Sequence, residues 1–444
     1  MRILLTLLAT LALTLPSGAK PNIVYILLDD AGYGDLSCYG QTKFSTPNID
    51  RLASEGMRFT DHYAGSTVCA PTRSVLMTGL HTGHTPSRGN KEVQPVGQHP
   101  LPGDTFTIAK ALREAGYTTG AFGKWGLGNP GSEGDPLNQG FDRFYGYNCQ
   151  RNAHTYYPTW LFDDKEKVAL DGETYAHDLI MEQGLAWIRE QRDKPFFAFF
   201  PVTIPHAAMH VPEKHAAPFR KKFPQFEDKI GKYGKNKPFA SNPAAQFAGM
   251  MTVLDDGIGQ ILNLLAELDL DGNTIVMLSS DNGPHREGGH MPDFFNSGGG
   301  LRGYKRDLYE GGIRAPMLAR WPGRIQPGTT TNHISAHWDL FPTFCELAET
   351  DIPPKLDGIS FVPTLLGKPQ PAHEALYWEF HERGGKRAVR MGKWKVIQND
   401  LKKKGPDAPL EIYDLSKDRT EKTNLVASQP EVAERARKIF KESH

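Results

Sequence analysis

One cysteine of this chain stands in a setting that points to chemistry. The stretch from Ser66 to Gly79 reads STVCAPTRSVLMTG and contains the pattern Cys69-x-Pro71-x-Arg73. An isolated cysteine is most often a small buried core residue, which is the plain alternative here. Because proline disfavours helix at the residue before it, the segment after Cys69 is expected to be extended, with a helix beginning at Arg73. A guanidinium placed there is suited to holding oxygen atoms of neighbouring groups.

Two pairs of oxygen-bearing side chains follow two expected strands. The apolar run 21–28 ends in Asp29-Asp30, and the run 273–280 ends in Asp281-Asn282. Continuous apolar runs are typical of buried parallel strands, whose carboxyl ends commonly carry ligand sites. Oxygen-only ligands suit a hard divalent cation. Taken alone, the first pair is equally compatible with a solvated turn.

Together these motifs resemble the signature of the type I sulfatases, which are arylsulfatase-like enzymes of the alkaline-phosphatase superfamily. The resemblance implies that a formylglycine-generating maturation enzyme oxidises Cys69 to formylglycine (3-oxoalanine). A hydrated aldehyde carries two hydroxyls, one to attack sulfur and one to expel sulfate afterwards. The resemblance also implies one bound Ca²⁺, held by the modified Cys69 together with Asp29, Asp30, Asp281 and Asn282.

Basic side chains complete the catalytic set that the resemblance implies, which includes Arg73. Lys124 in Gly-Lys-Trp and Lys305 in Leu-Arg-Gly-Tyr-Lys match family lysines that contact the sulfate. Two ammonium groups offset the negative charge of the transferring group. His206 matches a family histidine near the leaving oxygen, and an imidazole protonates a departing alcohol near neutral pH; His210 is the alternative. The ordinary alternatives are surface lysines and a histidine bonded to loop backbone.

The chain departs from the family at one position. Most sulfatases carry a histidine directly after Gly-Lys-Trp, and that histidine is thought to help expel sulfate, whereas this chain has Gly126. Glycine carries no proton, so either another histidine or a different base must serve this step. His154 is one candidate, with sugar binding as its alternative role, and His84 and His285 are lesser candidates. His381 is expected to contact the substrate.

The leading hypothesis is a calcium-dependent hydrolase that removes sulfate from a sulfated sugar or oligosaccharide. The combination of Gly-Lys-Trp-Gly with Ala-His-Thr-Tyr-Tyr-Pro resembles sulfatases of bacteria that degrade sulfated polysaccharides. Alternatives are a phosphonate or phosphodiester hydrolase of the same fold and a non-catalytic sulfoglycan-binding protein. A site with few cations and one metal favours a sulfate ester over the more highly charged phosphate monoester. The motifs leave the sugar, the sulfate position and the choice of exo or endo action open.

The overall composition and residues 1–19 further narrow the class of protein. The chain of 444 residues has 51 basic and 51 acidic side chains, so no global field favours nucleic acid or an anionic membrane. Four widely spaced cysteines without a CxxC motif argue against a disulfide framework and a zinc site. Residues 1–19 read as a signal peptide, because their apolar run is too short to span a bilayer comfortably. The mature protein is therefore expected to be exported, periplasmic or secreted, without an integral membrane segment.

The order of apolar runs predicts an α/β fold: a large mixed, mostly parallel sheet flanked by helices, as in alkaline phosphatase, with a smaller C-terminal antiparallel α+β domain. Residues 20–345 are expected to form the catalytic sulfatase domain and residues 346–444 the C-terminal antiparallel-sheet subdomain. Thr46 is expected to cap the helix that ends at Gly56. Residues 129–175 read as long loops. Further helices are expected at 104–116, from 246 onward and at 430–440. Further strands are expected at 117–122, 195–200, 375–380, 394–397 and 411–415.

Overall fold

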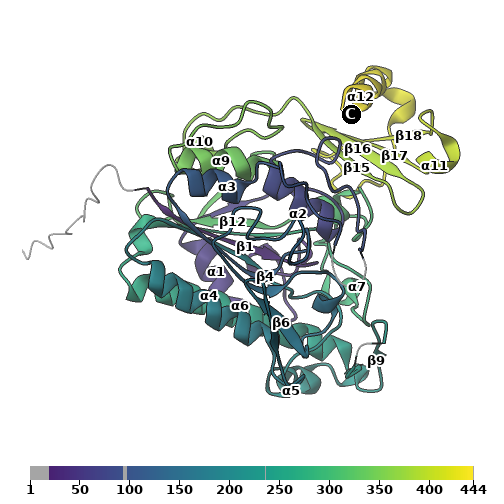
Figure 1. Ribbon diagram of the computed structural model, residues 1–444. Coiled ribbons are helices and arrows are strands. Elements are labelled where there is room, and N and C mark those ends of the chain that lie inside the picture. Colours follow the sequence, from purple (N-terminus) through teal and green to yellow (C-terminus); the bar gives the residue numbers. More distant parts are fainter. Residues whose placement is uncertain (1–19, 94–97, 236, 444) are drawn as a thin grey trace, which may run out of the picture.

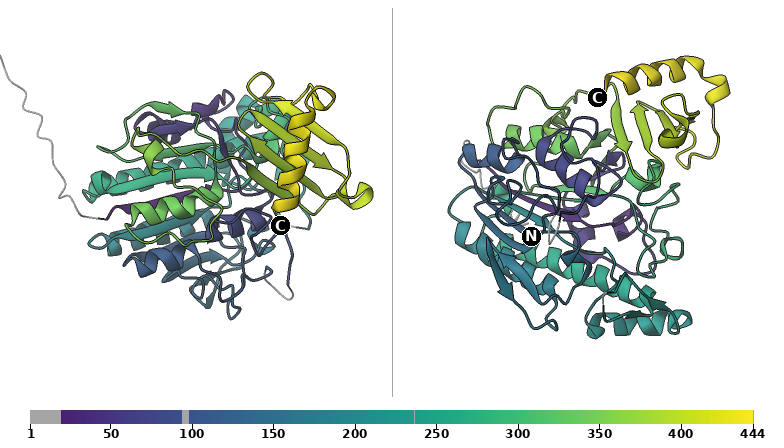
Figure 2. Two further views of the ribbon diagram at one scale, coloured as in Figure 1. Left: turned by 90° about the horizontal axis from the view of Figure 1, so that it is seen from above. Right: turned by 45° about the vertical axis from the view of Figure 1, so that its right-hand side comes forward.

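A computed structural model describes residues 20–93, 98–235 and 237–443. The expected signal peptide, residues 1–19, lies outside the described residues. The chain forms one large sheet with helices on both faces and a smaller four-stranded sheet at one end (Figures 1 and 2). This arrangement confirms the predicted fold class.

The large sheet has a parallel centre and antiparallel flanks. Its strand order is β13-β2-β12-β11-β1-β8-β4-β5-β6-β7. The central strands β11, β1, β8, β4 and β5 are parallel neighbours, whereas β12 and β6 run antiparallel to β11 and β5. The strands are β1 Asn22–Leu28, β2 Met57–Phe59, β4 Thr118–Lys124, β5 Arg143–Tyr147, β6 Trp160–Asp163, β7 Glu166–Ala169, β8 Phe196–Pro201, β11 Thr274–Ser280, β12 Met317–Arg320 and β13 Thr329–Thr331.

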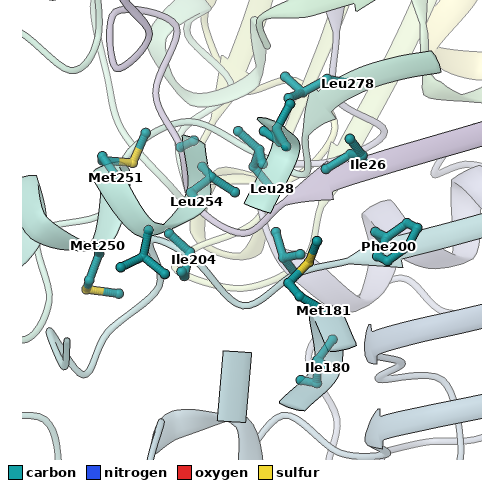
Figure 3. Close-up of a cluster of buried hydrophobic side chains, with 14 of the residues drawn as sticks. Ile26, Leu28, Ile180, Met181, Phe200, Ile204, Met250, Met251, Leu254 and Leu278 are labelled. Atoms are coloured by element: carbon teal, nitrogen blue, oxygen red, sulfur yellow. The ribbon is translucent and has the colours of Figure 1, made fainter. Parts of the chain in front are cut away.

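Helices bury both faces of this sheet, so that successive residues of a central strand enter different cores. One face is covered by α1 Pro47–Ser54, α4 Ala176–Gln191 and α6 Pro243–Glu267, and the other by α2 Cys69–Thr78, α3 Ile108–Glu114, α9 Leu340–Leu347 and α10 Val362–Leu365. In β1, Ile26 packs in the first core and Leu27 in the second. Figure 3 shows side chains of the first core, among them Ile26, Leu28, Phe200, Leu278, Met181 and Leu254.

The segment 129–175, expected to be loops, contains three strands of the sheet. β5, β6 and β7 are short, and β7 is polar and largely exposed, so no continuous apolar run marked them. The segment 212–243 contains α5 Glu213–Lys222 and a small hairpin of β9 Ile230–Gly231 with β10 Ala240–Ser241. Other short elements are β3 His62–Tyr63, β14 Ser335–Ala336, α7 Pro292–Phe295, α8 Glu310–Ile313 and α11 Leu401–Lys404.

Two helix starts differ from expectation. Thr46 stands at the N-cap position of α1, but its hydroxyl oxygen accepts a hydrogen bond from the Ser37 backbone N–H at 3.0 Å instead of capping the helix. Helix α3 begins at Ile108 and not near residue 104. There the Thr107 side chain accepts from the Lys110 backbone N–H at 3.2 Å, which is a true side-chain cap.

The C-terminal sheet is antiparallel, as expected, with one strand more than the sequence pattern indicated. It comprises β15 Leu376–Phe380, β16 Lys386–Met391, β17 Trp394–Asn399 and β18 Leu410–Asp414, with α12 Pro430–Glu442 packed on it. α9, which spans residue 345, and α10 still pack on the large sheet. The domain boundary at residue 345 stays a prediction.

A buried charge cluster ties the C-terminal sheet to the large domain. Lys395 of β17 is fully buried, and its ammonium group donates to Glu310 of α8 at 2.9 Å. Arg314 approaches the same carboxylate at 2.6 Å, and the Glu310 backbone N–H donates to Glu421 at 2.7 Å. Burial works to raise the pKa of Glu310, but Arg314 and Lys395 outweigh it and lower that pKa. The ion pairs between the C-terminal sheet and the large domain therefore contribute strongly to the stability of the folded protein.

Lys395→Met is expected to lower the free energy of unfolding by about 3–5 kcal/mol, because it leaves buried charge uncompensated. The matched control is Lys393→Met. The Lys393 side chain is 49% exposed and pairs with Asp414 at 2.9 Å, so its loss is expected to cost only about 0–1 kcal/mol. Urea-induced unfolding of both variants measures the difference. Equal losses for the two lysines would contradict the prediction.

Candidate active site

Helix α2 presents Cys69 from its first turn. The helix begins at Cys69 after the extended residue Val68, which corrects the expectation of an extended segment and a helix start at Arg73. Pro71 is the third helical residue, where a backbone N–H has no partner within the helix, so proline fits without losing a hydrogen bond. Arg73 then follows one turn after Cys69. Both side chains are buried, at 1% exposure each.

The two pairs of oxygen-bearing side chains, Asp29-Asp30 and Asp281-Asn282, meet at one edge of the sheet, as expected from their places after two strands. Leu28 and Ser280 are register partners in the parallel strands β1 and β11, so the residues that follow them are adjacent. The Asp30 backbone N–H donates to Asp281 Oδ1 at 3.0 Å, and Asn282 Nδ2 donates to Asp30 Oδ1 at 2.7 Å. Asp30 adopts a φ of 71°, which turns the chain sharply at this point. All four side chains, including Asp29, are fully buried.

Three buried cations approach these three carboxylates. Lys124, the last residue of β4, donates to Asp29 Oδ2 at 2.6 Å. Lys305 donates to Asp30 Oδ2 at 2.7 Å, and Arg73 Nη2 donates to Asp281 Oδ2 at 3.2 Å. The structure thus brings together every basic residue and every carboxylate expected at this site.

The balance between burial and neighbouring charges sets the protonation of the side chains in this cluster. Burial works to raise the pKa of Asp29, but Lys124, His206 and Arg73 outweigh it and lower that pKa. Burial works to lower the pKa of Lys305, but Asp30 outweighs it and raises that pKa well above its ordinary value. Asp281 differs, because burial and then Asp29 raise its pKa to about 7. The site is therefore held by charge pairs, and a cation bound beside Asp281 would favour its ionised form.

The Cys69 thiol lies against the acidic edge. Its Sγ donates to Asp29 Oδ1 at 3.4 Å. Burial and the Asp29 carboxylate raise the pKa of this thiol far above its ordinary value. Because the thiolate is the reactive form, unmodified Cys69 is a poor nucleophile here.

Three histidines form a stack beside the carboxylates. His206 lies with Nε2 3.5 Å from Asp30 Oδ2, and its ring stacks on that of His154 with centroids 5.2 Å apart and on that of His285 at 6.0 Å. Tyr233 packs edge-on against both His154 and His206. Burial, followed by Lys305, lowers the pKa of His206, and burial, followed by Lys124 and Lys305, lowers that of His154 to about 3. His210 instead bonds to the Pro238 carbonyl at 2.6 Å.

Two other candidate histidines are engaged elsewhere. His84 bonds to Asp357 at 2.9 Å and is 36% exposed. His381 follows β15, is 55% exposed and bonds to Glu379 at 2.7 Å. Sequence reasoning also missed two residues. Tyr233 belongs to no motif, and neither does Gln150, whose side chain lies beside Gly126.

Comparison with known proteins identifies the class. The chain matches the sulfatase family model over residues 21–350 and the model described as N-sulphoglucosamine sulphohydrolase, C-terminal, over residues 302–443. The chain therefore belongs to the sulfatase family, the sulfuric ester hydrolases of the alkaline-phosphatase superfamily. None of the described helices is long and apolar enough to cross a membrane.

The matches to individual relatives cover almost the whole chain. Arylsulfatase A of Bos taurus is 32% identical over 494 residues, covering 100% of this chain and 90% of its own length. N-acetylgalactosamine-6-O-sulfatase of Bacteroides thetaiotaomicron is 29% identical and covers 93% of this chain and 91% of its own length. A crystal structure of Ps i-CgsB in complex with k-i-k-neocarrahexaose superimposes with a TM-score of 0.81 at 26% identity, covering 96% of this chain and 93% of that one.

In protein whose Cys69 is unmodified, iodoacetamide at neutral pH is expected to leave Cys69 unlabelled in the native state. Its burial and its raised pKa both oppose reaction. Unfolding in urea is expected to restore labelling, as measured by mass spectrometry of the peptide that contains it. Equal labelling rates in the native and unfolded protein would contradict the buried position.

Proposed function

We propose that this protein removes sulfate from a sulfated sugar, using formylglycine formed from Cys69 and one calcium ion. The observation that carries the proposal is the convergence of Cys69, three buried carboxylates and three buried cations at one sheet edge. Such an arrangement can hold an anionic group without exposing it to water. The sulfatase family membership supplies the reaction class.

The donor set supports calcium as the metal. Asp29, Asp30 and Asp281 offer carboxylate oxygens, and Asn282 Oδ1 is buried without a hydrogen-bond partner among the described residues. Oxygen ligands from carboxylates and an amide are what Ca²⁺ prefers. When bound, the ion would polarise a sulfate oxygen and hold the nucleophilic oxygen close.

The chain's own residues then have distinct roles. Hydrated formylglycine at position 69 would supply one hydroxyl to attack sulfur and a second to release sulfate. Lys124 and Lys305 offset the negative charge of the transferring group, and Arg73 orients the carboxylates from the helix. His206, with Nε2 3.5 Å from Asp30 Oδ2, is assigned the proton transfer to the departing alcohol oxygen; because its pKa is lowered, it must take up that proton as the substrate binds. His154, stacked on it, is available for a second proton transfer or for the sugar.

Burial of Cys69 also supports a timing for its maturation. The thiol is 1% exposed, and every residue of α2 is buried. An enzyme that oxidises this side chain cannot reach it in the folded protein, so maturation by a formylglycine-generating enzyme must precede folding. This order fits a chain that is modified before or during export, with the periplasm or the exterior as its destination.

A sugar substrate is favoured over the alternatives. The relatives include an N-acetylgalactosamine-6-O-sulfatase and a protein solved with a neocarrahexaose. The ring of Tyr233 and the stacked His154 and His206 give the site an aromatic wall, which suits the apolar face of a sugar. A phosphodiester or phosphonate hydrolase is the second candidate. Comparing rates on aryl sulfate and aryl phosphate esters separates the two, and a screen of defined sulfated monosaccharides identifies the sugar.

Cys69→Ala is expected to abolish turnover of sulfate esters with little change in stability, because it removes the nucleophile and little volume. Cys69→Ser is expected to be nearly as inactive, since serine can accept sulfate but has no second hydroxyl to release it. Steady-state assays of variants and matured wild type measure this, and mass spectrometry detects sulfated serine. Multiple turnovers by Cys69→Ser at the wild-type rate would refute the formylglycine mechanism.

Asp281→Asn is expected to weaken calcium binding by more than the roughly 10- to 100-fold that a mutated outer-shell partner costs, because a charged ligand is lost. Calorimetric titration with Ca²⁺ measures the affinity, and chelation of the wild type should reproduce the loss of activity. The matched control is Asp293→Asn, whose side chain is 75% exposed in α7. Active wild-type protein without any bound divalent ion would contradict the assignment.

A further inference from the structure

The position that lacks the family's histidine is filled by another side chain. Gly126 adopts a φ of 76°, in the left-handed region that favours glycine. A Cβ added there would lie 3.6 Å from Arg73 Cδ and 3.1 Å from Gln150 Nε2. Gln150 therefore places its amide nitrogen where a side chain at position 126 would begin, beside the arginine that binds Asp281.

Strand pairing puts Gln150 there. β4 and β5 are parallel, with Lys124 and Tyr147 in register, and the pairing continues beyond both strands. The Gly126 backbone N–H donates to the Asn148 carbonyl at 3.0 Å, so residues 148–150 run beside the end of Lys124's strand. The Gln150 backbone N–H is held by Gln98 Oε1 at 3.3 Å. The position of Gln150 is therefore fixed by strand pairing in the sheet.

Unpaired amide atoms gather at this position. Gln150 is 5% exposed, and its Nε2 has no hydrogen-bond partner among the described residues. Asn148 is 1% exposed, and neither its Nδ2 nor its Oδ1 has one within the same ranges. Buried amide groups in folded proteins are nearly always paired, because an unpaired one is costly. Two such side chains, on the segment that pairs with the residues after Lys124, indicate that a bound group completes their hydrogen bonds.

We infer that Gln150 donates its amide N–H to an oxygen of the sulfate group that Lys124 and Lys305 hold. This inference rests on the proposed function and adds a substrate-binding residue to it. A carboxamide donates hydrogen bonds but carries no exchangeable charge, so it can bind sulfate in substrate and product without transferring a proton. Gln150 therefore takes over the binding part of the missing imidazole's role, and proton transfer is left to the histidine stack.

The test uses matured protein, an aryl sulfate ester as substrate and inorganic sulfate as product inhibitor. Gln150→Met keeps the length of the side chain and removes both donors. Its kcat/KM is expected to fall about 10- to 100-fold, with the inhibition constant of inorganic sulfate rising similarly, since a hydrogen bond to a charged group is lost. Gln150→Glu keeps the shape but repels sulfate, so both effects should be larger. The control is Gln183→Ala, on α4 and bonded to Arg143, which should leave both constants unchanged.

The outcomes separate the inference from the function it rests on. Parallel losses of kcat/KM and sulfate affinity, without a lower melting temperature, would support the inference. An unchanged sulfate inhibition constant in either variant, or a loss explained by a lower melting temperature, would overturn it while the sulfatase function stands. Wild-type protein with formylglycine at position 69 that hydrolyses no sulfate ester would overturn the proposed function itself, and the inference with it. If Gln150→Met does not fold, Gln150→Glu alone decides.

Discussion

The structure depends on a buried, nearly balanced set of charges at the carboxyl edge of its large sheet. Asp29, Asp30 and Asp281 each have a cationic partner within 3.2 Å, and none of them reaches water. Removing a single ion of this kind from water costs several kcal/mol unless its partner is held in place. The strands that carry these residues must therefore keep a fixed register, and the parallel pairing of β1 with β11 supplies it.

The C-terminal sheet takes part in this positioning although it contributes none of the carboxylates. Lys386 of β16 donates to the Arg306 carbonyl at 2.8 Å, next to Lys305. The Arg306 backbone N–H in turn donates to the Thr67 carbonyl at 3.0 Å, two residues before Cys69. A chain of hydrogen bonds thus links the small sheet to both the segment of Lys305 and the segment that leads to Cys69. The smaller sheet is therefore a support for the site as well as a separate structural unit.

What the sequence predicts well is local, and what it misses depends on distant partners. The apolar runs before Asp29 and Asp281 mark buried strands by themselves, so the acidic edge was predictable. The start of α2 at Cys69 was not, because the effect of Pro71 depends on its position in the first turn. Gln150 and Tyr233 have no local signal, since their importance comes only from the residues that lie beside them. The strands β5 to β7 were missed because their short, partly polar sequences become strands only by pairing: β5 pairs with β4, β6 with β5 and β7 with β6.

The absence of the family's histidine at residue 126 therefore involves two positions, Gly126 and Gln150. Any side chain at residue 126 would have to adopt a strained φ of 76° and would come within 3.1 Å of the Gln150 amide. A histidine cannot simply be added at 126 unless Gln150 moves, and a smaller residue at 150 alone would leave a gap beside Arg73. The two positions are sterically coupled across paired strand ends. The chain thus has a glycine and a neutral amide at the place where the family resemblance implies an imidazole. In the mechanism proposed above, proton transfer is then left to His154 and His206, whose rings are stacked.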